Sequence, residues 1–139
     1  KIVDKYNIPH EDIEFELTES SFISDNHKLV ELTFNLQKGS FHVLMDDFGS
    51  GYSSLNMLKE MPLDILKMDL KFLDGEQEKG RKILKALIDM AHTLNLKVVV
   101  EGVETLSQVE FLRPFGDCSI QGYYYSKPIV AEAFEELMK

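Results

Sequence analysis

Short apolar runs alternate along the chain with longer segments in which apolar residues recur at helical spacing. The apolar runs predict strands at residues 13–17, 41–46, 65–69, 97–100 and 119–121. The longer segments predict helices at residues 26–37, 53–60, 77–94, 106–113 and 130–138. A strand followed by a helix, repeated along the chain, is typical of a parallel sheet with helices packed outside it. The sequence therefore predicts an α/β fold.

Two of the predicted strands are apolar without a break. Val43, Leu44 and Met45 follow one another in the second strand, and residues 98–100 of the fourth strand are all valine. Continuous runs of this kind indicate strands that are buried on both faces. Residues 1–8 have the pattern of the end of a preceding helix, and the chain begins at Lys1 with neither an initiator methionine nor a signal sequence. We therefore expect a piece of a longer protein.

Composition and charge narrow the classes of function. A length of 139 residues is typical of one domain. The formal net charge of -9 argues against a nucleic acid polymer as partner, because Lys and Arg supply the affinity for its backbone. A phosphate ester would need a metal cation to offset this charge. Cys118 is the only cysteine, which excludes an intrachain disulfide and favours the cytoplasm as the compartment. No apolar stretch is long enough for a membrane segment.

Polar residues stand at the carboxyl end of every predicted strand, where parallel α/β folds place their binding sites. These residues are Glu16, Glu19, Asp46, Asp47, Lys67, Asp69, Glu101, Glu104 and Gln121. An isolated acid at such a position is often a helix cap or a solvated loop residue, and that alternative stays open for each of them. Adjacent carboxylates such as Asp46 and Asp47 repel each other unless a cation lies between them. Oxygen ligands without histidine or cysteine favour Mg²⁺ or Mn²⁺ over zinc.

Two further features of the sequence bear on this site. Lys67 lies inside an apolar strand, and burial of a lysine is costly unless its ammonium group is paired, so we expect it to face the acidic residues. The glycines of residues 47–55 permit a tight loop, which we interpret as shaping a metal site, since it lacks the lysine of a phosphate-binding P-loop. We expect the three consecutive tyrosines to support the core rather than to stack on a base; they are Tyr123, Tyr124 and Tyr125.

Five segments closely resemble the EAL domain family of bacterial cyclic-di-GMP phosphodiesterases. They are residues 16–20 (ELTES), 46–55 (DDFGSGYSSL), 66–69 (LKMD), 101–105 (EGVET) and 121–123 (QGY). The resemblance covers essentially the whole chain in the same order. It implies a modified (β/α)₈ barrel of the TIM type, in which a two-metal site with Mg²⁺ or Mn²⁺ hydrolyses one phosphodiester bond of cyclic di-GMP and gives linear pGpG; that two-metal site is incomplete in this chain.

The same resemblance implies a role for each matching residue. Glu16, Asp46 and Asp47 are similar to metal ligands of the family, and Lys67 is similar to the residue that positions the attacking water. Glu101 resembles the carboxylate that acts as general base or holds metal-bound water, and Gln121 resembles a residue that supports water and substrate. Glu19, Asp69 and Glu104 resemble residues that hold these groups in place. Glu19 is expected to tether the glycine-rich loop near the family's dimer contact.

The chain also departs from the family pattern. The Glu-Ala-Leu motif and an upstream Asn ligand are absent and would lie before Lys1, and five βα units are present of the eight in a closed barrel. Leu70 replaces a common Arg, and Val100 replaces a common Ala. We expect residues 1–139 to form the C-terminal part of an incomplete EAL domain, with exposed sheet edges and no hydrolytic activity of its own.

Three explanations of the short length remain open: a fragment, a tightly paired dimer, or a naturally shortened binding protein. For the parent protein, we expect a phosphodiesterase with sensory or GGDEF-type domains upstream, and a homodimer. The alternatives are a non-catalytic receptor for cyclic di-GMP and a dimerising scaffold.

Overall fold

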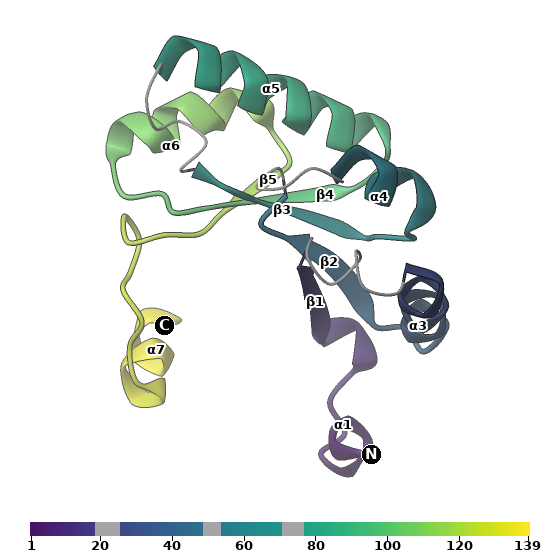
Figure 1. Cartoon of the computed structure of the whole chain (residues 1–139). Helices are drawn as coiled ribbons and strands as arrows, with labels where there is room; N and C mark the ends of the chain where they lie inside the picture. Colours follow the sequence, from purple (N-terminus) through teal and green to yellow (C-terminus); the bar gives the residue numbers. More distant parts are fainter. Residues whose placement is uncertain (19–25, 49–53, 71–76) are drawn as a thin grey trace.

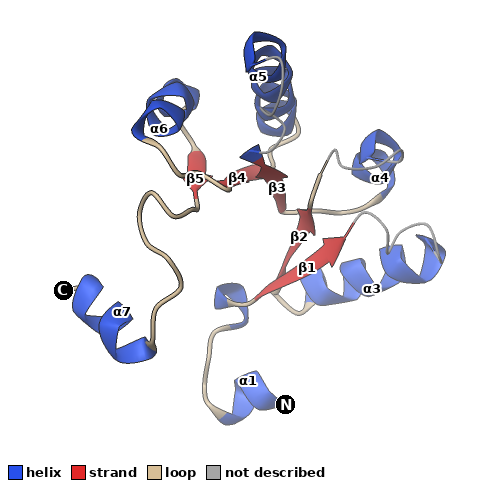
Figure 2. Ribbon diagram, turned by 60° about the vertical axis from the view of Figure 1, so that its left-hand side comes forward, coloured by secondary structure: helices blue, strands red, loops and turns tan. Residues whose placement is uncertain are grey.

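The computed structural model describes residues 1–18, 26–48, 54–70 and 77–139. In these ranges one parallel sheet has its strands in chain order, β1 to β5, so that each strand lies beside its predecessor. The strands are β1 (Glu14–Thr18), β2 (His42–Asp46), β3 (Ile65–Asp69), β4 (Lys97–Glu101) and β5 (Cys118–Ile120). The predicted parallel α/β architecture is confirmed. The arc of strands in Figure 2 is the partial barrel that the resemblance implied.

Helices cover the outer side of this arc. The α-helices are α1 (Ile2–Lys5), α3 (Asn26–Lys38), α4 (Ser54–Glu60), α5 (Gln77–Thr93), α6 (Leu106–Leu112) and α7 (Ala131–Leu137), with 3-10 turns η1 (His10–Asp12) and η3 (Arg113–Phe115). Helices α3 to α6 lie outside the strands, whereas α1 and α7 lie toward the open side of the arc (Figures 1 and 2). Within the described ranges, no helix combines the length and the apolar character that crossing a membrane requires.

Several element ends differ by one residue from the prediction, and two have a clear cause. The last strand ends at Ile120 because the carbonyl of Gln121 turns out of the ladder to accept the amide of Val103 at 3.2 Å. Helix α6 ends at Leu112 and is followed by η3, in which Pro114 has no amide hydrogen for a further helical bond.

The core lies between the sheet and its outer helices. Side chains of a strand alternate between its two faces, so the buried Leu66 and Met68 of β3 pack toward α5, which contributes Leu84 and Ile88. The intervening Lys67 therefore points to the concave side of the arc. The sheet thus separates an apolar layer under the helices from a polar inner face near the strand ends.

The open side of the arc carries exposed apolar side chains. Phe15 of β1 is partly exposed, and Phe134 and Leu137 of α7 are largely exposed. Strands β1 and β5 each have one neighbouring strand among the described residues. The predicted exposure of sheet edges and apolar surface is confirmed for this part of the chain.

Candidate metal and phosphate site

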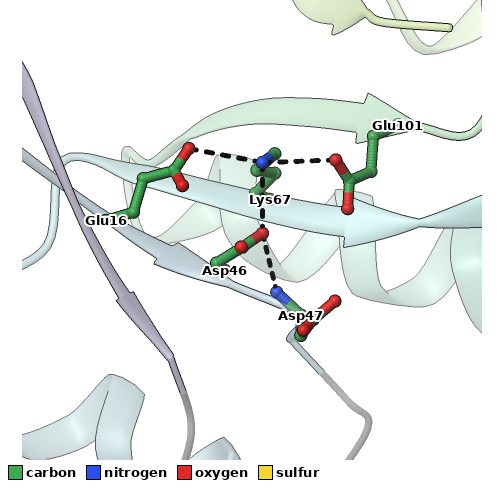
Figure 3. A network of polar contacts seen from close by, with 5 residues as sticks. All are labelled: Glu16, Asp46, Asp47, Lys67 and Glu101. Carbon is green, nitrogen blue, oxygen red and sulfur yellow. Dashed lines mark hydrogen bonds and ion pairs between the residues drawn. The ribbon is translucent and has the colours of Figure 1, made fainter. Parts of the chain in front are cut away.

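Lys67 stands at the centre of the polar inner face. Its side chain is only 12% exposed, and its Nζ atom lies 3.3 Å from Glu16 Oε1, 3.3 Å from Asp46 Oδ1 and 3.2 Å from Glu101 Oε2. These partners come from β1, β2 and β4, and they converge on the lysine from different sides (Figure 3). The prediction that the buried ammonium group faces the acidic strand ends is confirmed.

The charge of Lys67 is held in place by its surroundings. Burial alone lowers the pKa of Lys67, but hydrogen bonds and attraction from Glu101 and Asp46 outweigh it and raise the pKa above its usual value. The lysine therefore stays cationic. An ammonium group donates hydrogen bonds and accepts none, so Lys67 can orient oxygen atoms but cannot take up a proton.

Three carboxylates form a group that suits a cation. One oxygen each from Asp46, Asp47 and Glu101 lies within 4.8 Å of the others. Asp47 follows the end of β2 with a φ of 53°, and its amide donates to Asp46 Oδ1 at 3.0 Å. The buried Phe48 fixes this bend, because its amide donates to the carbonyl of Lys67 at 3.2 Å. An all-oxygen donor set of this kind fits Mg²⁺ or Mn²⁺.

The grouping differs in one respect from the ligand set that the resemblance implied. Glu101 stands with Asp46 and Asp47, whereas Glu16 is outside that group and contacts the opposite side of Lys67 (Figure 3). The side chain of Glu16 is 54% exposed and therefore has room to turn. Its role as a metal ligand stays a prediction.

A cavity of about 540 Å³ opens beside Glu101 at the ends of β3, β4 and β5. Its walls include Asp69, Glu101, Glu104 and Gln121, which the sequence singled out. Tyr123 also lines it and is 57% exposed, so the prediction that this tyrosine supports the core is wrong. Tyr124 and Tyr125 are exposed as well, because the segment that carries them runs along the open side of the arc.

The first turn of α6 contains a residue that the sequence interpretation missed. Gln108 lines the cavity, and its Oε1 accepts the amides of Glu104 at 2.8 Å and Thr105 at 2.9 Å. Thr105 in turn caps α6 by accepting the amide of Gln108, which completes a capping box. The spacing Thr-x-x-Gln before an apolar helix is the signal that predicts this arrangement.

Two predicted features lie outside the described residues. Glu19 is one of them, and the glycine-rich stretch at residues 49–53 is the other. Of the loop after β2, the structure describes Asp47 and Phe48.

Comparison with known proteins identifies relatives over most of the chain. The family profile of the EAL domain matches residues 1–128. The cyclic di-GMP phosphodiesterase NbdA of Pseudomonas aeruginosa is 39% identical over 129 residues, which are 91% of this chain and 16% of that protein.

Solved structures agree with this match. The EAL domain of Mycobacterium smegmatis DcpA superposes with a TM-score of 0.90 at 33% identity, over 98% of this chain and 62% of that one. The phosphodiesterase PaMucR in complex with c-di-GMP superposes with a TM-score of 0.85 at 34% identity, over 95% of this chain and 54% of that one. The chain thus spans less than two thirds of either structure and about a sixth of NbdA.

Proposed function

The chain belongs to the EAL domain family, and on that premise we propose that it is part of a metal-dependent phosphodiesterase that hydrolyses cyclic di-GMP to linear pGpG. Two similarities support the proposal: NbdA is named for this activity, and PaMucR binds c-di-GMP in its structure. In this proposal, the whole enzyme extends beyond residues 1–139, and this chain forms the C-terminal part of its barrel.

One observation carries the proposal. The ammonium group of Lys67 lies within 3.3 Å of carboxylates from three strands, beside the group formed by Asp46, Asp47 and Glu101. A cluster of acids alone would repel a phosphate ester, whereas acids that hold cations beside a fixed ammonium group attract one. This combination favours phosphodiester chemistry over a purely structural ion-pair network.

The metal would be held by Asp46, Asp47 and Glu101, with Glu16 as a further ligand. Bound Mg²⁺ or Mn²⁺ would stabilise the charge that develops on the phosphate oxygens and make water more acidic near neutral pH. Lys67 would hold the oxygen of the attacking water by donating a hydrogen bond to it. Fixing the water in line with the phosphorus atom lowers the entropic part of the barrier.

Proton transfer falls to a carboxylate in this mechanism. Because Lys67 remains cationic, the base must be a carboxylate, and the family resemblance gives this role to Glu101. The water oxygen would bond to phosphorus as the bond from phosphorus to the 3′-oxygen breaks, and the proton accepted by Glu101 would pass through solvent to that oxygen, which restores the carboxylate. The linear product keeps the phosphate at its 5′ end.

The cavity beside Glu101 provides space for the substrate. Gln121 would contact water and substrate there, and Asp69 and Glu104 would hold the neighbouring backbone and side chains in position. Glu19 would tether the loop that follows β2. These roles follow the family resemblance and stand as parts of the proposal.

The test is hydrolysis of cyclic di-GMP with Mn²⁺ by the complete natural polypeptide that carries this chain. Glu101→Gln keeps the size of the side chain and removes its charge, so we expect loss of turnover by about a hundredfold or more. Glu110→Gln, on the exposed side of α6, is the matched control and retains full activity. Turnover in Glu101→Gln equal to that of the control would overturn the proposal, and binding without hydrolysis by the wild type would establish the receptor alternative.

Residues 1–139 alone are expected to be inactive, because the matching structures contain barrel that this chain lacks.

We also propose that the complete protein is a cytoplasmic homodimer with sensory or GGDEF-type domains upstream. The single half-buried cysteine and the exposed apolar side chains of α7 support the first two points. A solution mass of the complete protein tests the dimer, and a monomer would contradict it.

A further inference from the structure

The loops that follow β4 and β5 are joined through the backbone of Val103. Its amide donates to the carbonyl of Gln121 at 3.2 Å, and its carbonyl accepts the amide of Tyr124 at 3.0 Å. The side chain of Val103 is fully buried in the core, so this residue is a fixed point. The segment that carries Gln121 is therefore held against the loop that directly follows Glu101.

Gly122 allows this close approach. A Cβ atom at position 122 would lie 2.1 Å from the Val103 carbonyl oxygen, 2.4 Å from its nitrogen and 2.7 Å from its carbonyl carbon. All three are backbone atoms of an anchored residue, which cannot move aside as a flexible side chain would. Any side chain at position 122 must therefore displace the segment that carries Gln121.

The displaced segment borders the proposed catalytic site. Gln121 and Glu101 line the same cavity, and the amide of Gln121 donates to the carbonyl of Val100 directly before Glu101. A shift of about 1 Å in a group that orients reactants is enough to cost a large factor in rate. We propose that Gly122 is a positioning residue, whose missing side chain lets Val103 hold Gln121 in place beside Glu101. The catalytic part of this inference rests on the proposed function.

The test compares Gly122→Ala with Gly116→Ala in the complete natural polypeptide. Gly116 has a φ of 71° and nothing within 4 Å of an added Cβ, so Gly116→Ala strains the backbone at a distance from the cavity. We expect Gly122→Ala to lower kcat for cyclic di-GMP about tenfold or more, and Gly116→Ala to change it less than twofold. Equal kcat values for Gly122→Ala and the wild type would overturn the proposal.

A double-mutant cycle distinguishes positioning from general loss of stability. If Gly122 acts through Gln121, Gly122→Ala should change kcat less than twofold when Gln121 is already alanine. If the full tenfold factor persists in that background, the proposal is wrong. Should Gly122→Ala not fold, Tyr124→Pro is the alternative variant, because it removes the amide that donates to the Val103 carbonyl. Tyr124→Pro should also lower kcat, and this effect should disappear when Gln121 is already alanine.

Hydrogen exchange measures the packing of the segment after Gln121 independently of hydrolysis. Peptides that cover residues 121–126 should exchange at least tenfold faster in Gly122→Ala than in the wild type, while peptides covering β3 remain protected. Unchanged exchange would overturn the proposed packing role. If the wild type exchanges as expected but shows no phosphodiesterase activity, the proposed function fails and the packing role stands.

Discussion

Replacement of Lys67 by methionine is the most informative perturbation of the site. Methionine has a similar length and no charge, so Glu16, Asp46 and Glu101 lose a cation that lies within 3.3 Å of each. If these carboxylates bind metal, the ammonium group competes with the metal for them while it also orients water. We therefore expect Lys67→Met to bind Mn²⁺ more tightly than the wild type and to turn over substrate more slowly.

The size of both effects follows from simple electrostatics. Two unit charges about 4 Å apart interact by about 1 kcal/mol in water and more strongly in a partly buried site, so a divalent ion near the ammonium group is repelled by at least about 2 kcal/mol. Removal of that repulsion corresponds to a gain of about 30-fold in Mn²⁺ affinity. Loss of a fixed donor at a reacting oxygen costs a factor of about 100 or more in kcat.

Calorimetric titration with Mn²⁺ measures the first effect, and hydrolysis at saturating Mn²⁺ measures the second. Lys67→Arg keeps the charge and serves as the control, since its Mn²⁺ affinity should stay within a few-fold of the wild type. Weaker Mn²⁺ binding by Lys67→Met than by the wild type would refute the reasoning, because it would mean that the lysine supports the bound ion.

Three other predictions concern parts of the chain outside the site. The Asp64 carboxylate accepts the buried amide of Val43 at 2.8 Å and the amide group of Gln37 at 3.0 Å, so Asp64→Ala should lower the free energy of unfolding in urea by about 2–4 kcal/mol. Burial raises the pKa of Cys118 to about 11, although a hydrogen bond with the Val100 backbone opposes this. Its alkylation by iodoacetamide at pH 8 should therefore be about 100-fold slower than that of an exposed thiol of pKa near 8.5. The two ring nitrogens of His10 face Asp4 and the Gly39 carbonyl, and both contacts raise the pKa of His10. The contribution of His10 to stability should therefore be present at pH 6 and be lost as the pH rises above the pKa of His10 in the folded protein.

Each of these predictions has a control. Asp64→Asn keeps one acceptor for Val43 and should cost less than Asp64→Ala; equal losses would show that the Val43 amide finds another partner. Alkylation of Cys118 as fast as that of glutathione would contradict its burial. For His10, the difference in unfolding free energy between wild type and His10→Gln should shrink from pH 6 to pH 9, and a pH-independent difference would contradict the charged pairing with Asp4.

The sequence predicted the fold and much of the site because both depend on short-range patterns. Alternation of apolar runs and helical periodicity is enough to specify a parallel sheet, and parallel strands bring their carboxyl ends to one edge. Asp46, Lys67 and Glu101 were therefore expected to meet, and they do. The charge of Lys67 inside an apolar strand was itself the signal, since a buried ammonium group requires partners.

The features that the sequence did not predict depend on side-chain direction and on contacts between distant loops. One such feature is the grouping of the carboxylates: Glu101 rather than Glu16 stands beside Asp46 and Asp47. The fit of Gly122 against Val103 joins segments far apart in the chain, so no local pattern contains it. The tyrosines were misplaced because periodicity does not distinguish a core-facing from a cavity-lining aromatic residue in a short loop.

The formal charges of four carboxylates and Lys67 bear on how many cations the proposed phosphodiester substrate would need at this site. Four ionised carboxylates and one ammonium group give three net negative charges; they belong to Glu16, Asp46, Asp47, Glu101 and Lys67. One divalent cation leaves a single negative charge, which still repels the substrate phosphate. Two divalent cations leave a single positive charge, which attracts it and offsets its charge. The lysine therefore reduces the negative charge of these four carboxylates, and the proposed phosphodiester substrate would be repelled less by a site that held two divalent cations than by a site that held one.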